Sequence, residues 1–311
     1  MSAEKVYVGV DIAKDTLAVC FLNRHCQYPN TPAGHAALLG ELGKIGMAAQ
    51  LVCEATGGYE RTLVQAASQA GWPISLLNPR QVRDYAKARN QLAKTDKVDA
   101  AILADYGKTL QPASTAVPSA QQQMLAELVG ARQDLIEERT REISRQEHLQ
   151  LPALVRDAKT ALRRLEKRIE MIDRLIDAQI EADQDLSAKA ARMEQVVGIG
   201  RVTVLTLLAL MPELGKISPQ QAAALVGVAP YAHESGQYRG QRHIRGGRPA
   251  LRRVLYMAAV SACQHNRILS AYYRSLVARG KPVKVALTAI MRKLIVLLNR
   301  LLINPNFALA G

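Results

Sequence analysis

The chain has 311 residues, of which 49% are hydrophobic but only 4% aromatic, so its cores must be built mainly from aliphatic side chains. Lysine and arginine number 41 and aspartate and glutamate 27, which gives a net charge of +14. There is no uncharged apolar run of about 18 residues and no signal-peptide pattern after Met1, so we expect a cytoplasmic protein without a membrane span.

The first 118 residues alternate strand and helix patterns. Short β-rich runs are expected at 6–10, 17–21, around 27–28, 51–53 and 74–77. Helical patterns fill 32–47, 59–70, 80–90 and 96–109. Thr31 and Pro32 mark the first helix start, with a capping hydroxyl and a first-turn proline. The order β-β-β-α-β-α-β-α predicts a mixed sheet flanked by helices, in a domain spanning residues 1–118.

Residues 119–190 contain almost no glycine or proline, and leucine and isoleucine recur in them at helical spacing. Charged side chains of both signs fill the positions between, and Pro152 interrupts the pattern. We therefore expect two long α-helices joined near residues 150–153, which form a coiled-coil arm. Such an arm would serve dimerisation or spacing.

Residues 191–311 are expected to form a mainly helical, basic domain. They carry 17 basic and 3 acidic side chains, whereas residues 1–190 carry 24 of each. This asymmetry points to a polyanion bound by the C-terminal domain. Near its start, Gly198 and Gly200 resemble the turn of a helix-hairpin-helix, where glycine lets the backbone approach a phosphate. A tight turn between packed helices looks the same, so both interpretations stay open.

Four acidic residues are spaced for metal binding. Asp11 and Glu54 each follow an apolar strand pattern, and Asp96 and Asp99 stand at positions i and i+3 of a predicted helix start. Singly, each carboxylate could cap a turn or favour a helix N-terminus. Together they are the oxygen-rich set that two Mg²⁺ ions about 4 Å apart require to polarise a phosphodiester. Glu60 is an alternative to Glu54, but it falls inside a predicted helix.

Zinc chemistry is not expected. The four cysteines include no C-x-x-C pair, and the six histidines form no zinc motif. Unpaired cysteines in a chain that is not secreted are usually small, reduced core residues.

The most concentrated local pattern is the stretch 229–248, which is punctuated by glycines and contains four arginines. Ser235 lies in it. A serine hydroxyl becomes a good nucleophile only when its proton is removed or its developing charge is neutralised. The arginines suit the second role, and Glu234 or His233 could accept the proton. The alternative is a mobile loop whose serine only contacts a phosphate. Predicted nucleic-acid contacts are Lys94, Gly198, Gly200, Arg239, Arg242, Arg245, Arg248 and Arg252.

Several motifs, in this order, carry a family resemblance. They are VGVDIAK at 8–14, CEATG at 53–57, NP at 78–79, KTDKVDA at 94–100, GIG at 198–200, GVAP at 227–230, ESG at 234–236 and RRVLYM at 252–257. This series, which covers nearly the whole chain, resembles the DEDD transposases of mobile insertion sequences. That family includes members guided by a bridge RNA and the Piv-type DNA invertases.

The resemblance implies a RuvC-like N-terminal domain of RNase H type, whose acidic tetrad falls on Asp11, Glu54, Asp96 and Asp99 and holds Mg²⁺. It also implies a coiled-coil arm and a transposase domain whose nucleophilic serine maps onto Ser235. The implied reaction is exchange between donor and target DNA through a covalent phosphoserine–DNA intermediate. A bridge RNA from the element's non-coding end would guide it. Dimers would pair into a tetramer in which the tetrad of one subunit meets the serine of another. The protein would be associated with the nucleoid when bound to DNA.

Two other functions remain open at this stage. A structure-specific endonuclease acting on DNA junctions would use water as the nucleophile at the same metal site, and would not need Ser235. A non-catalytic nucleic-acid-binding protein would rely on the basic C-terminal domain alone. Neutralising Asp11 or Asp96 would then leave function intact or tighten DNA binding.

Overall fold

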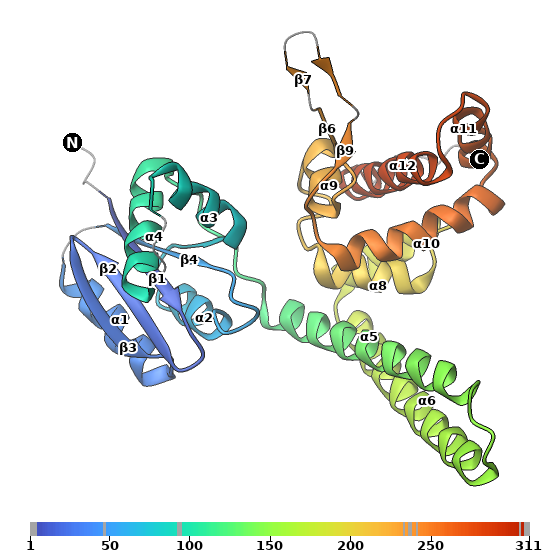
Figure 1. Ribbon diagram of the computed structural model, residues 1–311, viewed down its shortest axis with the longest axis horizontal. Coiled ribbons are helices and arrows are strands. Elements are labelled where there is room, and N and C mark those ends of the chain that lie inside the picture. The colour runs from blue at the N-terminus through green and yellow to red at the C-terminus, as the bar shows by residue number, and fades with distance from the viewer. Residues whose placement is uncertain are drawn as a thin grey trace. The chain divides into compact units, whose positions relative to one another are not determined.

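The structure is a computed structural model that describes residues 5–45, 48–91, 95–232, 234–235, 238–240, 242–304 and 306–307. For residues 234–235 and 238–239 it describes the backbone alone. The chain forms two compact units, Met1–Val117 and Pro118–Gly311 (Figure 1). Within the described ranges, no helix is both long and apolar enough to cross a membrane. The further division predicted between residues 190 and 191 stays a prediction.

The first unit is built on a five-stranded sheet. Its strands are β1 (Val6–Ile12), β2 (Thr16–Phe21), β3 (Arg24–Pro29), β4 (Ala49–Glu54) and β5 (Ile74–Leu77). They lie in the order β3-β2-β1-β4-β5. The first three form an antiparallel meander, and β4 and β5 continue parallel to β1. This mixed sheet is consistent with an RNase H-like fold.

Helices cover both faces of the sheet. They are α1 (Pro32–Lys44), α2 (Arg61–Gln69), α3 (Pro79–Ala88) and α4 (Asp96–Leu110). Side chains of α1 and α2 share a core with one face, and those of α3 and α4 with the other. All five strands and all four helices of the sequence prediction are confirmed. The largest difference at a helix start is in α2, which begins at Arg61 instead of residue 59, so Glu60 stands at the N-cap position instead of inside the helix.

The second unit begins with two long helices that fold back on each other, α5 (Ala120–Gln146) and α6 (Pro152–Glu181). Pro152 stands in the first turn of α6, where its missing N–H costs nothing. Isoleucines at helical spacing, such as Ile169 and Ile176, are buried along the inner face of α6. The Arg132 guanidinium of α5 contacts the Asp173 carboxylate of α6 at 2.5 Å. The predicted pair of helices is confirmed, while dimerisation through it stays a prediction.

The rest of the second unit is mainly helical, as predicted. Its helices are α7 (Gln184–Glu194), α8 (Arg201–Leu210), α9 (Pro219–Val226), α10 (Pro249–His265), α11 (Arg267–Ala278) and α12 (Val283–Ile303). Helix α12 contributes fully buried side chains such as Ile290 and Leu294, and it packs against α9, α10 and α11. The sequence prediction missed four two-residue strands between α9 and α10. They are β6 (Pro230–Tyr231), β7 (Glu234–Ser235), β8 (Tyr238–Arg239) and β9 (His243–Ile244).

Candidate active site

Asp11 lies on the face of the sheet that α4 covers. The even-numbered residues of β1 are buried in the core shared with α1 and α2, so the odd-numbered residues point to the opposite face. Gly9 shows how close α4 comes to that face. A Cβ added at Gly9 would lie 2.0 Å from the backbone oxygen of Ala100 and 2.4 Å from the backbone nitrogen of Ala104. Strand and helix backbones therefore touch two residues before Asp11.

Helix α4 crosses this face antiparallel to β1. Gly107 is the residue of α4 that meets Tyr7, whereas Gly9 meets Ala100, Leu103 and Ala104, a group centred about four residues before Gly107. Two residues of a strand advance about 6.6 Å and four residues of a helix about 6 Å. Continuing this spacing by two strand residues brings Asp11 level with the first turn of α4.

The first turn of α4 carries the acidic pair Asp96 and Asp99. The Thr95 hydroxyl begins the helix by accepting a hydrogen bond from the backbone N–H of Val98 at 3.4 Å. The helix start predicted from this threonine is therefore confirmed. Asp96 is exposed and Asp99 is half-buried, one turn apart on the same side of the helix.

Glu54 reaches the same edge through the parallel pairing of β1 with β4. Val10 is in register with Cys53, so the next residues along the two strands, Asp11 and Glu54, are neighbours. Residues in register on neighbouring strands point to the same face. The backbone thus brings all four predicted carboxylates to one edge of the sheet, on the side covered by α4.

The donor set fits a divalent cation, because carboxylate oxygens are the ligands that Mg²⁺ prefers. The side chains themselves do not converge in this structure. Across the described residues, no three His, Cys, Asp or Glu side chains lie close enough together to hold a metal ion. The four carboxylates therefore fit a metal ion in their backbone placement and donor chemistry.

Glu60 has a different task from the four carboxylates. It is almost completely buried, and one of its carboxylate oxygens accepts hydrogen bonds from the Thr56 N–H at 3.1 Å, the Thr56 hydroxyl at 2.9 Å and the Gly58 N–H at 2.9 Å. Burial acts to raise its pKa, but these hydrogen bonds outweigh burial and lower the pKa below its ordinary value of 4.5. A carboxylate held in this way folds the loop that follows Glu54.

Ser235 belongs to the second unit and lies on a β-hairpin. At the root, β6 pairs with β9, and further out β7 pairs with β8, with Ser235 opposite Tyr238. Figure 1 shows β7 projecting away from the helices. The side chains of His233, Glu234 and Ser235 lie outside the described residues, so the proton acceptor for the serine stays a prediction.

The root of this hairpin is clamped. One guanidinium nitrogen of Arg252 donates to the carbonyl oxygens of Gly246 at 2.8 Å and Gly227 at 3.3 Å, which joins the two ends of the hairpin. Gly247 is pressed against the backbone of Gly227, where an added Cβ would lie 2.2 Å from the backbone nitrogen. Both glycines have positive φ, of 74° and 77°. The sequence prediction missed this clamp, although the glycines that allow it were visible.

Other predicted nucleic-acid contacts also have partners within the protein. The Arg248 guanidinium contacts the Glu213 carboxylate at 2.6 and 3.0 Å and the Leu210 carbonyl at 2.6 Å. Gly198, with φ of 102°, is packed against Ala262 of α10. This packing favours the tight-turn interpretation at Gly198.

Nothing in the described part of the chain tests the remaining predicted contacts. Gly200 caps α8 with an extended backbone. Arg242 and Arg245 are exposed, whereas Lys94 and the side chain of Arg239 lie outside the described residues. Nucleic-acid contact by all of these positions stays a prediction.

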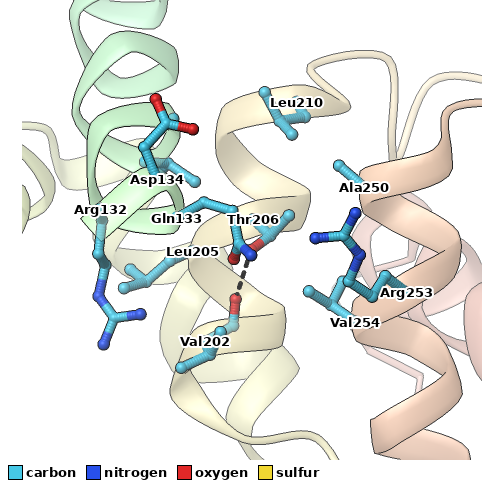
Figure 2. A pocket seen from close by; sticks show the side chains of 12 residues that line it. Arg132, Gln133, Asp134, Val202, Leu205, Thr206, Leu210, Ala250, Arg253 and Val254 are labelled. Atoms are coloured by element: carbon cyan, nitrogen blue, oxygen red, sulfur yellow. Dashed lines mark hydrogen bonds between the residues drawn. The ribbon is translucent and has the colours of Figure 1, made fainter. Parts of the chain in front are cut away.

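A cavity of about 150 Å³ lies between α5, α8 and α10 (Figure 2). Most of its lining is apolar, and the Thr206 hydroxyl at its wall donates to the Val202 carbonyl at 2.7 Å. Its two arginines, Arg132 and Arg253, are paired with carboxylates of the arm. It contains none of the predicted catalytic residues, so we do not assign the active site there.

Two family profiles match the chain. Residues 8–151 match a profile described as transposase, and residues 190–274 match that of the transposase IS116/IS110/IS902 family. The first match covers the sheet and the four carboxylates, and the second covers the hairpin with Ser235. The chain is also 28% identical over 302 residues to the pilin gene-inverting proteins of Moraxella lacunata and Moraxella bovis, and covers 94% of each.

Proposed function

This chain belongs to the IS116/IS110/IS902 family of transposases, which are enzymes that recombine DNA. We propose that it recombines DNA through a covalent bond between Ser235 and the DNA. Asp11, Glu54, Asp96 and Asp99 would hold the divalent metal that the family requires, as two Mg²⁺ ions. The observation that most directly supports this metal site is the backbone placement of these four carboxylates at one edge of one sheet face.

The proposed metal site serves the phosphate at which a DNA strand is cut. Mg²⁺ bound there would polarise that phosphate and neutralise charge as the strand breaks. The protein's part is to keep the backbone positions that carry these carboxylates at one edge of the sheet. Packed backbones do this, since β1, β4 and α4 are in direct contact beside the site.

The proposed nucleophile is the Ser235 hydroxyl. Its oxygen forms a bond to the scissile phosphorus, the bond from phosphorus to the 3′-oxygen of the DNA breaks, and the serine proton ends on that 3′-oxygen, carried there by a general base such as Glu234 or His233. The phosphodiester energy is kept in the phosphoserine link, so a second DNA 3′-hydroxyl can displace the serine without external energy. Exposed arginines near the hairpin would neutralise the phosphate charge.

The partners follow from the same family. We propose that the chain binds donor and target DNA together with a bridge RNA from the element's non-coding end, and that base pairing selects the sequence while the basic C-terminal part holds phosphates. Dimers joined through α5 and α6 would pair into tetramers, so that the carboxylates of one subunit act with Ser235 of another. The relatives are named for inverting a pilin gene, which makes inversion one candidate outcome beside insertion and excision.

The test is a search for the covalent protein–DNA adduct on a denaturing gel. The reaction contains Mg²⁺, DNA with the element's junction and RNA from its non-coding flank. Wild type and the control Ser275→Ala, an exposed serine of α11, should form the adduct. Ser235→Ala and Asp11→Ala should not. DNA cleavage without an adduct, unchanged in Ser235→Ala, would contradict the proposal and indicate a hydrolytic nuclease.

A further inference from the structure

The carboxamide of Asn30 joins two loops of the first unit. Asn30 follows β3, and its backbone N–H is held by the Asp15 carbonyl at 2.9 Å. Its side-chain nitrogen donates to the carbonyl oxygen of Ala13 at 2.9 Å and to that of Tyr59 at 3.3 Å. One amide group therefore links two segments that lie 46 residues apart in the sequence.

These two segments are the continuations of the strands that carry Asp11 and Glu54. Ala13 stands two residues after Asp11, and Tyr59 stands five residues after Glu54. The separation between the ends of β1 and β4 affects how far apart the two carboxylates lie. The Asn30 link fixes the loops on the far side of both carboxylates, where the pairing of β1 with β4 has ended.

His35 of α1 sets the orientation of this amide. Its Nε2 lies 2.7 Å from the Asn30 Oδ1, and because a carboxamide oxygen can only accept, the imidazole must donate. His35 is only 2% exposed, and burial lowers its pKa. A neutral, buried imidazole keeps the Asn30 oxygen turned toward α1 and its NH₂ group turned toward the two loops.

The second loop is rigid enough for such a link to matter. Glu60 accepts three hydrogen bonds from Thr56 and Gly58, and the Ala55 N–H donates to the Leu77 carbonyl at the end of β5. A shift in the position of Tyr59 would therefore also shift Glu54, because the loop between them is held by hydrogen bonds. Shells of this kind, which orient metal ligands without touching the metal, typically change metal affinity or activity 10–100-fold when they are removed.

We infer that Asn30 is a positioning residue of the acidic site, whose side-chain amide holds the loops after Asp11 and Glu54 at a fixed separation. This inference rests on the proposed metal site. Asn30 does not touch the metal or the DNA in this role; it acts through the two loops. His35 supports it by orienting the amide.

The experiment measures Mn²⁺ binding by the full-length, DNA-free chain through isothermal titration calorimetry, together with amide hydrogen exchange in a peptide covering 55–60. Two variants remove the link. Asn30→Ala deletes it, whereas Asn30→Asp keeps the size and the acceptor for His35 but loses both NH₂ donors. Gln27→Ala, an exposed residue of β3, is the matched control. Asp11→Ala reports the metal site itself.

We expect both Asn30 variants to bind Mn²⁺ roughly tenfold more weakly and to exchange the 55–60 amides faster, with Gln27→Ala unchanged. If Asn30→Ala fails to fold by circular dichroism, Asn30→Asp decides. Equal affinity in Asn30→Asp and Gln27→Ala would overturn the positioning role while Asp11→Ala still loses binding. If Asp11→Ala binds Mn²⁺ as well as wild type does, the metal site is wrong and the positioning role falls with it.

Discussion

The acidic edge of the first unit and the serine hairpin of the second unit hold their proposed functional residues in opposite ways. At the acidic edge, backbones touch directly, as at Gly9, and the polar side chains of Asn30 and Glu60 fix the loops. The hairpin consists of two-residue strands that extend from a root clamped by Arg252. The first region is held by backbone packing and hydrogen-bonded loops, and the second is clamped at its base.

This contrast matches what each half of the proposed reaction demands. Metal ligands must be held to within about half an ångström to share a cation. A nucleophile carried to DNA needs reach more than rigidity, and can be aligned once the substrate is bound. If this interpretation is right, substitutions at the acidic edge should change metal binding and stability, and substitutions at the hairpin root should change the reaction alone.

The largest effect is expected from Glu54→Gln. Loss of a metal-binding carboxylate removes several kcal/mol of charge stabilisation, so DNA cleavage should fall about 10³-fold or more. Glu60→Gln, which weakens the loop but removes no ligand, should reduce cleavage only about tenfold. Cleavage rates over a range of Mg²⁺ concentrations measure both. A larger loss in Glu60→Gln than in Glu54→Gln would show that the second ligand has been assigned to the wrong glutamate.

The next effect is on stability. Gly9→Ala places a methyl group 2.0 Å from a backbone oxygen that cannot turn away, so we expect about 3 kcal/mol of destabilisation with loss of metal binding. The control is Gly40→Ala in α1, where an added Cβ meets nothing within 4 Å and should stabilise the helix by about 0.5–1 kcal/mol. Urea unfolding measures both. Equal stability of the two variants would mean that α4 is not packed on β1 as described.

A smaller effect is expected at the hairpin root. Arg252→Ala removes the hydrogen bonds that join the two ends of the hairpin, and adduct formation should slow about tenfold at unchanged stability. Arg253→Ala removes the same charge from the next residue, where the guanidinium contacts Glu137 of the arm, and should slow it less than twofold.

The salt dependence of DNA binding separates this clamp from the predicted phosphate contact. If Arg252 neutralises a phosphate, the slope of log affinity against log salt should shrink by about 0.9 in Arg252→Ala. If Arg252 only holds the hairpin root, the slope in Arg252→Ala should equal the slope in Arg253→Ala. A changed slope would therefore return Arg252 to the DNA-binding surface.

The smallest effect is a pH dependence. Because the pKa of Glu60 is lowered from 4.5 by folding, its contribution to stability is fully present above pH 4.5 and is lost as the pH falls through the lower, folded-state pKa. The difference in unfolding free energy between wild type and Glu60→Gln should therefore shrink toward acid pH. Asp84→Asn, at an exposed site of α3, is the control. A difference that grows toward acid pH would contradict the hydrogen-bonded carboxylate.

Sequence patterns predicted the first unit well, because its strands are apolar runs and its helices have caps such as Thr31 and Thr95. They also placed Asp11 and Glu54 at strand ends. The hydrogen bonds of Asn30 could not be predicted, since they join residues far apart in the chain through a single polar side chain. Glu60 was misplaced inside a helix, because a helical pattern does not show which residue is the cap.

In the second unit, sequence patterns predicted the long helices but not the strands around Ser235. Strands of two residues are too short for an alternating pattern. A weaker signal was present: Ser235 and Tyr238 are separated by Gly236 and Gln237, and a glycine-containing pair between short polar runs is typical of a tight hairpin. Arg248 and Arg252 were interpreted as phosphate contacts, yet both are bound to the protein itself.

The clamped root turns the serine hairpin into a lever. Ser235 stands eight positions after Gly227, so an extended arm reaches at most about 28 Å from the Arg252 clamp. Rotation by about ten degrees at the root would move the end of such an arm by roughly 5 Å. This displacement is several times the length of an oxygen–phosphorus bond. Small movements of α10, which carries Arg252 in its first turn, would thereby be converted into larger displacements of Ser235, the proposed nucleophile.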